Sequence, residues 1–289
     1  MPQAPRFEAI AAARRHDAAA RMPLRLGGRA VGSVAIACLD ALREHAAWLT
    51  LRDDALTTDL AGAALDAAFA QTHRALQRIG LVTGWRDETY AIVPGLGAPP
   101  LARIERAASR FWGSLTFGAH ANGHVVDAAG RPSHLWIAQR AWTKPTDPGL
   151  LDNLVGGGVP WDQTPQQTLV REGWEEAGLD AATMAHAVPG RVIELKRDLP
   201  DCSGHGLQWE QLFVFDLALP AGLLPRNQDG EVESLRLLPV DEALALAAGG
   251  AMTVDAALVT LDFALRHRLL APADHARLAA RAAHLFVSG

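Results

Sequence analysis

Three glutamates near the middle of the chain have the spacing to bind a metal ion together. Glu172, Glu175 and Glu176 stand at i, i+3 and i+4 of a predicted helix, which places their carboxylates on one helix face. On a bare helix these like charges repel by roughly 0.3 kcal/mol per pair. A hard divalent cation would reverse that repulsion, and Mg²⁺ or Mn²⁺ prefers oxygen ligands of this kind. The pattern therefore predicts Mg²⁺ as the cofactor, with Mn²⁺ as an alternative.

The ends of the helix that carries these glutamates can be predicted from the sequence. Thr164 and Gln167 fit a capping box at its start, and Pro165 falls at the first helical position. Gly178 suits a left-handed cap at its end, with Leu179 placed to fold back onto the last turn. The side expected to pack inward carries three apolar residues: Val170, Trp174 and Ala177.

The segment from Gly156 to Leu179 resembles the Nudix box, in which a Gly, five residues, a Glu and seven residues precede the string REUXEEXGU, U being a bulky aliphatic residue. The positions that match are Gly157, Arg171, Glu172, Glu175, Glu176, Gly178 and Leu179. The sequence departs from the box at Gln163, where the box has a loop Glu, and at Gly173, where it has an aliphatic residue. The first change removes a carboxylate, and the second costs roughly 1 kcal/mol of helix propensity relative to Ala. The resemblance implies an α/β fold: an α/β/α sandwich with a mixed sheet and the catalytic helix between its layers.

The resemblance extends over roughly residues 20 to 245, with GWRDETYAIV ahead of the box and PRNQDGEVESL after it. These segments are similar to the Nudix branch related to the hydrolase half of fungal thiamine pyrophosphokinase proteins. That branch implies a Mg²⁺-dependent pyrophosphohydrolase that converts thiamine diphosphate, or its oxo and oxy analogues, to the monophosphate and phosphate. It also implies an N-terminal α/β domain that assists substrate binding, here residues 1–114. The Nudix domain with its C-terminal helices would then occupy residues 115–289.

The resemblance also implies roles for individual residues. Glu172, Glu175 and Glu176 would bind the metal; Glu176 is the expected constant ligand, and Glu172 is either a ligand or the base. Arg171 would fix a glutamate rotamer and brace the preceding loop. A further metal-binding carboxylate is expected from DGEVE, and only one of its two glutamates can face the site because side chains alternate on an extended segment. Glu231 is taken as that ligand, with Glu233 as the alternative.

Substrate-binding residues are expected on both sides of the box. Arg140 and Lys144, at the end of a predicted strand, are assigned to the phosphates, for which the fork of Arg is well suited. The alternative is that they only solubilise the surface. Arg86 and Glu88, together with His120, are assigned to a pocket for the rest of the substrate. For His120 a position in the hydrophobic core is the competing interpretation.

Flat aromatic side chains are a further candidate for substrate binding. The chain has eight Trp against one Tyr. Trp85, Trp136 or Trp209 could stack on a heteroaromatic ring, as thiazolium and pyrimidine groups are. Most of the tryptophans are expected in the core, because Trp is largely buried on average.

The elements that must position these residues follow from hydrophobic periodicity and turn residues. Strands are expected at 89–93, 119–126, 135–138, 191–195 and 207–216. Helical patterns occupy 4–21, 33–45, 60–79 and the tail from residue 240 onward. Residues 142–158 are expected to be irregular until the box helix begins, because Pro and Gly interrupt them.

Composition limits the partners. With 27 Lys+Arg against 32 Asp+Glu the net charge is -5, so there is no global basic field for a nucleic-acid polymer or an anionic membrane. Charges interrupt the first 21 residues, and no run of eighteen apolar residues occurs, which argues against a signal peptide and a spanning helix. The expected protein is soluble and cytoplasmic, with a small-molecule diphosphate as its partner; a homodimer is left open. Lysine occurs only at 144 and 196, which makes Lys144 a sharper candidate.

Three alternatives remain. The substrate could instead be a nucleoside diphosphate sugar, ADP-ribose or a dinucleotide. The fold could also serve as a non-catalytic ligand sensor, although retention of all three helix glutamates argues against this. An isomerase of prenyl diphosphates would need a catalytic Cys facing a Glu; Cys38 lies in the first block and Cys202 in a polar loop. The two cysteines also show no disulfide or zinc-site spacing and are expected to be reduced thiols.

Overall fold

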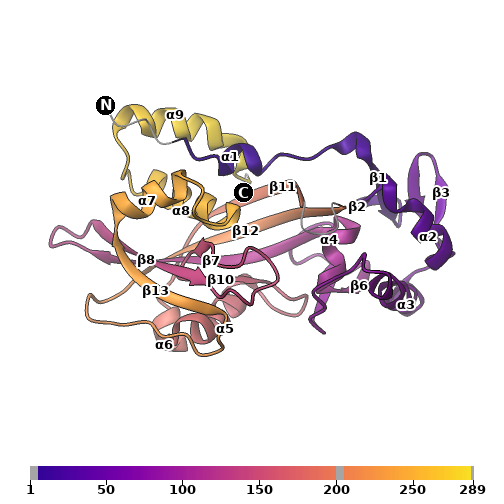
Figure 1. Ribbon diagram of the computed structural model, residues 1–289, viewed down its shortest axis with the longest axis horizontal. Coiled ribbons are helices and arrows are strands. Elements are labelled where there is room, and N and C mark those ends of the chain that lie inside the picture. Colours follow the sequence, from indigo (N-terminus) through magenta and orange to yellow (C-terminus); the bar gives the residue numbers. More distant parts are fainter. Residues whose placement is uncertain (1–5, 200–204, 288–289) are drawn as a thin grey trace.

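The computed structural model describes residues 6–199 and 205–287. Two units lie side by side in it, a small N-terminal unit and a larger sandwich of helices and sheet (Figure 1). Cys38 is a buried free thiol in the first unit, whereas Cys202 lies outside the described residues. No helix in these two ranges is long and apolar enough to cross a membrane.

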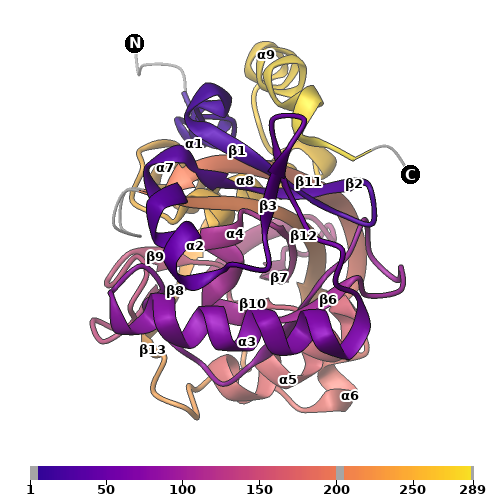
Figure 2. The same ribbon diagram turned by 90° about the vertical axis from the view of Figure 1, so that its right-hand side faces the viewer.

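The N-terminal unit is organised around the long helix α3 (Gly62–Arg78), which crosses the front of Figure 2. Its inward residues recur at helical spacing, and Phe69 meets Trp112 edge to face at 5.0 Å. The unit also contains β1 (Arg21–Leu26), β2 (Arg29–Ala35), α2 (Leu39–His45), β3 (Thr50–Arg52), β4 (Ala55–Thr57), β5 (Thr89–Ile92), β6 (Ala102–Glu105) and α4 (Ser109–Trp112). Short 3-10 turns cover Ala18–Ala20, Ile36–Cys38 and Arg106–Ala108. One sheet has the order β2-β1-β4-β3, and β5 pairs with β6.

The larger unit is built on a mixed sheet in the order β11-β12-β7-β8-β13, with β10 paired to β7 and β9 to β8. Its strands are β7 (Leu115–Val126), β8 (Pro132–Arg140), β9 (Leu151–Asp152), β10 (Val155–Gly158), β11 (Val188–Leu199), β12 (Gly206–Ala218) and β13 (Val232–Pro239). Its helices are α5 (Pro165–Ala177), α6 (Ala181–Met184), α7 (Val240–Ala248), α8 (Val254–Arg266) and α9 (Pro272–Ala282), followed by a 3-10 turn at Ala283–Leu285. Strands β7 and β12 run parallel, and the other pairs in this sheet are antiparallel.

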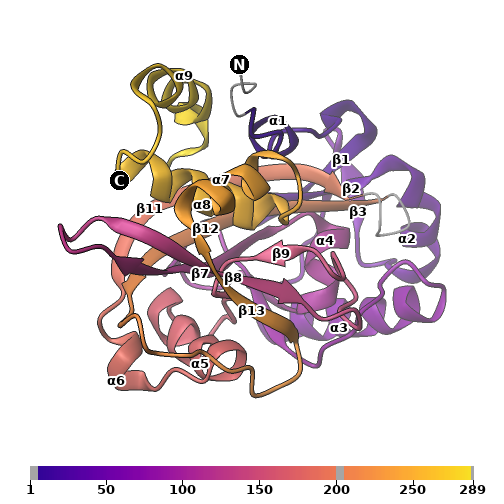
Figure 3. The same ribbon diagram turned by 60° about the vertical axis from the view of Figure 1, so that its left-hand side comes forward.

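Helices cover both faces of this sheet. Helices α5 and α6 lie on one face and α7 and α8 on the other (Figure 3). Helix α8 is buried from Ala256 to Leu265, as expected of a helix that is apolar on nearly every side. This arrangement confirms the predicted α/β/α sandwich with a mixed sheet.

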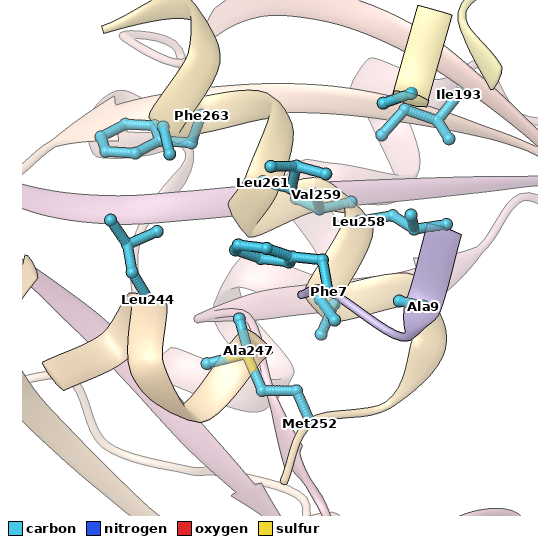
Figure 4. Packing of buried hydrophobic residues seen from close by; sticks show 14 of the residues in the cluster. Phe7, Ala9, Ile193, Leu244, Ala247, Met252, Leu258, Val259, Leu261 and Phe263 are labelled. Carbon is cyan, nitrogen blue, oxygen red and sulfur yellow. The ribbon is translucent and has the colours of Figure 1, made fainter. Parts of the chain in front are cut away.

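The first described residues complete the core above α8. Phe7 is fully buried in a cluster with Leu244, Met252, Leu258 and Phe263 (Figure 4). Helix α1 (Ala9–Ala12) packs on α8. The chain then follows the edge of the sheet, where the amide of Lys196 donates to the carbonyl of Ala13 at 2.7 Å. The start of the chain therefore packs against the larger unit before the chain enters the smaller one.

Three predicted elements differ from the structure. Of the helix expected at 4–21, only Ala9–Ala12 is α-helical among the described residues, and β1 already begins at Arg21. The helix expected at 33–45 begins only at Leu39, because the preceding residues extend β2, paired along β1. The irregular stretch expected at 142–158 contains β9 and β10. Glycine has little strand propensity, so Gly156–Gly158 is a strand only because β7 supplies its hydrogen-bond partners.

Candidate active site

Helix α5 has the ends that the sequence predicts. The hydroxyl of Thr164 accepts a hydrogen bond from the amide of Gln167 at 3.2 Å, and the Gln167 side chain accepts from the amide of Thr164 at 2.8 Å. Gly178 closes the helix in the left-handed conformation, with φ of 64°. The capping box and the cap fix the helix register, and with it the direction in which each glutamate points.

The three glutamates of α5 lie in different environments. Glu172 and Glu176 are buried, whereas Glu175 is half-buried. Arg171 donates to Glu172 at 2.8 Å and to Glu175 at 2.7 Å, so one guanidinium orients both carboxylates. Arg171 therefore contacts both glutamates, and its role in fixing a glutamate rotamer stays a prediction.

Glu176 is held against the glycine strand. It accepts a hydrogen bond from the amide of Gly156 at 2.8 Å, and no basic side chain in the described ranges forms an ion pair with it. Burial and the neighbouring Glu172 raise the pKa of the Glu176 carboxyl well above its usual range. A Cβ at Gly157 would collide with the carboxylate of Glu172, so only glycine lets β10 approach this closely.

These carboxylates fit a divalent cation. Glu172 and Glu176 are two buried oxygen donors one helical turn apart, and among the described residues no cationic side chain forms an ion pair with Glu176, although Lys144 acts on it from the cavity side. A hard cation would stabilise the ionised form of both groups. Within residues 6–199 and 205–287 no three His, Cys, Asp or Glu side chains already converge as a ligand set. Glu175 instead pairs with Arg171.

Gly173 and Trp174 explain one departure from the predicted packing. Trp174 was expected to face inward, but its side chain is 55% exposed. Gly173 faces inward instead, and a Cβ there would lie only 2.6 Å from the sulfur of Met184 on α6. Met184 therefore fills the space that an aliphatic residue of the box would occupy, which accounts for the glycine.

A cavity of about 300 Å³ opens on the other side of β10, and Gly156, Gly157 and Gly158 form part of its lining. The cationic side chains on this part of the lining, called the basic wall below, are Arg86, Arg106, Arg110, Arg140 and Lys144. Burial, and to a lesser extent the neighbouring arginines, lower the pKa of Arg86. A wall of this kind suits a phosphorylated ligand.

Carboxylates and carbonyls hold parts of the basic wall in place. Arg140 donates to Asp152 at 2.9 Å and to the carbonyl of Thr146 at 2.9 Å. Lys144 donates to Glu231, and Arg86 lies 3.6 Å from the same carboxylate. Glu231 therefore turns toward the site, whereas Glu233 is exposed.

Comparisons with known proteins agree with this geometry. Residues 119–256 match the family described as NUDIX domain, and residues 5–115 match the family described as Domain of unknown function (DUF4743). The matched range contains β10, α5 and all three helix glutamates. The chain contains a NUDIX domain.

Two related proteins from Arabidopsis thaliana match the chain over lengths that include parts of both the DUF4743 and the NUDIX ranges. Nudix hydrolase 20, chloroplastic, is 37% identical over 207 residues, which cover 71% of this chain and 54% of the relative. Nudix hydrolase 24, chloroplastic, is 36% identical over 206 residues, covering 71% and 55%. The chain thus spans about half the length of these curated relatives. Among solved structures, that of DR0079 from Deinococcus radiodurans has a TM-score of 0.44 at 22% identity, covering 60% of this chain and 97% of that one.

The other predicted residues lie around the NUDIX domain as follows. Glu88 does not line the cavity; it pairs with Arg106 at 2.7 Å and borders a second hollow beside Gln163 and Arg171. Gln163 accepts from the hydroxyl of Thr168 at 3.0 Å, so this substituted box position is held by α5. His120 is buried and also lines the cavity. Its position is therefore compatible with both predictions, a residue of the core and a residue of the substrate pocket.

Of the three tryptophans considered for stacking, only Trp209 lines this cavity. Trp136, on strand β8, is buried in the cluster that also contains Leu169 of α5. In the N-terminal unit the guanidinium of Arg74 stacks over the ring of Trp85.

Sequence reasoning missed Arg106 and Arg110. Both come from the DUF4743 part of the chain and reach the cavity of the NUDIX domain. Arg110 donates to the hydroxyl of Thr146 at 3.1 Å and forms no ion pair with a carboxylate in the part of the chain that the structure describes. Their spacing of four residues was the only signal, and a pair of arginines on a short helical segment is too common to predict a site.

Proposed function

We propose that the chain is a Mg²⁺-dependent Nudix pyrophosphohydrolase that cleaves a diphosphate linkage in a small molecule. The observation that carries this proposal is the position of β10: the buried Glu172 and Glu176 lie against its glycines, and the same glycines line the basic cavity. A diphosphate in the cavity would therefore lie close both to the cationic side chains and to a metal held by α5. The names of the two Arabidopsis hydrolases agree with this chemistry.

Each group has a defined task in this reaction. Glu172 and Glu176 would hold the cation, which when bound supplies positive charge against the phosphate oxygens. Arg171 keeps Glu172 in position, and Glu172 is also the candidate base for the attacking water. Lys144 and Arg140 would bind the non-bridging phosphate oxygens, where negative charge accumulates during hydrolysis.

The N-terminal domain, proposed as residues 1–114, would complete the substrate site of the Nudix domain proposed as 115–289. It supplies Arg86, Arg106 and Arg110 to the basic wall. We propose thiamine diphosphate or its oxo and oxy analogues as substrates, with the monophosphate and phosphate as products. This substrate rests on the sequence resemblance and on the small volume of the cavity.

A hydrolysis screen tests the proposal. Purified protein with Mg²⁺ is given thiamine diphosphate and its oxo and oxy analogues, a nucleoside diphosphate sugar, ADP-ribose and a dinucleotide, and the products of each reaction are identified by liquid chromatography and mass spectrometry. We expect the thiamine compounds to be hydrolysed. If only a nucleotide derivative is hydrolysed, the proposed reaction class is supported and thiamine diphosphate is rejected as the substrate. If compounds bind but none is hydrolysed, the result favours a non-catalytic ligand sensor.

The metal assignment is tested by Glu176→Gln. Removing one buried metal-binding charge should lower kcat by at least about 100-fold, with an unchanged circular dichroism spectrum. Glu242→Gln on the exposed face of α7 serves as the matched control and should retain wild-type activity. Unchanged turnover in Glu176→Gln would reject the metal site.

Location and assembly remain predictions from sequence. The cytoplasmic location is unconfirmed, and both Arabidopsis relatives are named as chloroplastic. The homodimer, and the absence of nucleic-acid and membrane partners, likewise stay predictions. Fractionation and light scattering would test them directly.

A further inference from the structure

The cavity has a second wall whose chemistry is opposite to that of the basic wall. It is formed by Gln208, Glu210 and Asp255, called the acidic wall here. The side-chain nitrogen of Gln208 donates to Glu210 at 2.8 Å and to Asp255 at 3.0 Å. One amide therefore holds two carboxylates side by side.

Positive charge from the protein offsets these two carboxylates only in part, because Arg110 and His120 act on Glu210 without pairing with it. Among the residues that the structure describes, neither Glu210 nor Asp255 forms an ion pair. The guanidinium of Arg197, which also lines the cavity, donates to the oxygen of Gln208 at 2.9 Å. Burial and the neighbouring Asp255 raise the pKa of the Glu210 carboxyl. Positive charge brought by a ligand would relieve this repulsion.

Three polar atoms in the same lining have no hydrogen-bond partner. They are the Oδ1 atom of Asp255, the hydroxyl of Ser114 and the indole nitrogen of Trp209. Ser114 is only 2% exposed. Buried polar groups are rarely left unpaired, because each lost hydrogen bond costs about 1–3 kcal/mol. An acceptor, a hydroxyl and a donor thus lie unpaired in residues that line the cavity, so this lining has hydrogen-bonding capacity that the contacts of the described residues do not use.

We propose that the acidic wall is a subsite for a nitrogen-containing organic group with N–H donors or a positive charge, attached to the diphosphate at the basic wall. The inference rests on the proposed function and names the substrate class more closely. A metal ion fits this subsite less well, because Gln208 turns its NH₂ group rather than its oxygen toward the carboxylates. A substrate whose second end is anionic would be repelled by the same carboxylates.

Binding measurements on the full chain separate the two walls. Thiamine, which carries no phosphate, probes the acidic wall, and inorganic pyrophosphate with Mg²⁺ probes the basic wall, both by isothermal titration calorimetry. Asp255→Asn should weaken thiamine binding at least tenfold and change pyrophosphate binding less than twofold. Arg110→Gln should weaken pyrophosphate binding at least tenfold and change thiamine binding less than twofold. Asp241→Asn is the matched control, since Asp241 lies in the first turn of α7 as Asp255 does in that of α8, but is exposed.

If Asp255→Asn fails to fold, Glu210→Gln is used in its place. This variant removes the other carboxylate of the acidic wall, which lies on strand β12 and not in the first turn of a helix. Wild-type protein that does not bind thiamine, or unchanged thiamine affinity in Glu210→Gln and in a folded Asp255→Asn, would overturn the subsite. Thiamine binding that depends on these carboxylates, in a protein that hydrolyses no diphosphate, would reject the proposed function and support the subsite. Diphosphate hydrolysis by a protein whose thiamine binding does not depend on these carboxylates would support the proposed function and reject the subsite.

Discussion

At the residue scale, the site depends on how charges are shared. Arg171 is bound by two of the α5 glutamates, whereas Glu176 accepts only a backbone amide among the contacts described above. On the other side of β10, Glu231 lies between Lys144 and Arg86. A single carboxylate there reduces the repulsion between two neighbouring cations of the basic wall.

The two glutamates of the DGEVE segment should differ sharply in their effect on activity. Glu231→Gln removes the carboxylate that holds Lys144, so we expect kcat/KM for the diphosphate substrate to fall about tenfold or more. Glu233 is exposed, and Glu233→Gln should change kcat/KM for the same substrate less than twofold. Steady-state kinetics of both variants measures this difference. Equal effects would show that Glu231 has no special position.

At the element scale, α5 is fixed by its caps and by the close approach of α6. Both caps follow from local sequence, as does the face that carries the glutamates. The packing beneath Gly173 does not, because Met184 reaches it only through the turn between the two helices. Local patterns thus predicted α5 and its ends but not the contact that replaces its missing aliphatic residue.

Gly173→Ala tests that contact. Alanine gains about 1 kcal/mol of helix propensity, but its Cβ would force Met184 from a fully buried position, which costs about 1–3 kcal/mol. We expect a net loss of about 1 kcal/mol in the free energy of unfolding, measured by urea denaturation. In a Met184→Ala background the same change should be stabilising. A destabilising effect in both backgrounds would argue against the contact.

The contact between α3 and α4 should make stability depend on pH. Burial lowers the pKa of His73 from its ordinary 6.5 to about 3, and its neutral ring accepts a hydrogen bond from Trp112 at 2.8 Å. Below pH 6.5 the unfolded chain takes up a proton at His73 that the folded chain does not. The free energy of unfolding should therefore fall by about 1.4 kcal/mol per pH unit between about 6.5 and 3.

Comparison with His73→Gln isolates this contribution. The variant cannot be protonated, and its amide oxygen can also accept a hydrogen bond from Trp112. Between pH 6.5 and 5.0 the wild type should lose about 2 kcal/mol more than the variant in chemical denaturation. Parallel pH profiles would show that His73 is not the titrating group.

At the scale of the whole molecule, the site is assembled from distant parts of the chain. The sequence predicted the sandwich, the α5 glutamates, and Arg86, Arg140 and Lys144 near the site. It could not predict β10, since Gly156–Gly158 has no strand pattern of its own. It also missed Arg110 and the pair Glu210 and Asp255, because only tertiary packing brings them to one cavity. Short-range patterns specify elements, whereas the cavity depends on contacts between elements far apart in sequence.

Phe7 joins the start of the chain to this assembly. It is fully buried in the core above α8, so Phe7→Ala should lower the free energy of unfolding by about 3–5 kcal/mol. Leu224→Ala, at a side chain that is 68% exposed, should cost less than about 0.5 kcal/mol. Guanidinium denaturation gives both values. A small effect at Phe7 would mean that the larger unit is stable without the start of the chain.

The position of α1 has a consequence for motion. Because α1 packs on α8 and the chain then runs along β11, the polypeptide passes between the two units twice, first ahead of β1 and again between α4 and β7. Two covalent crossings restrict the relative motion of the units more than a single linker would. Any hinge between them must run through both crossings, so motions about other axes would have to break the packing of α1 on α8.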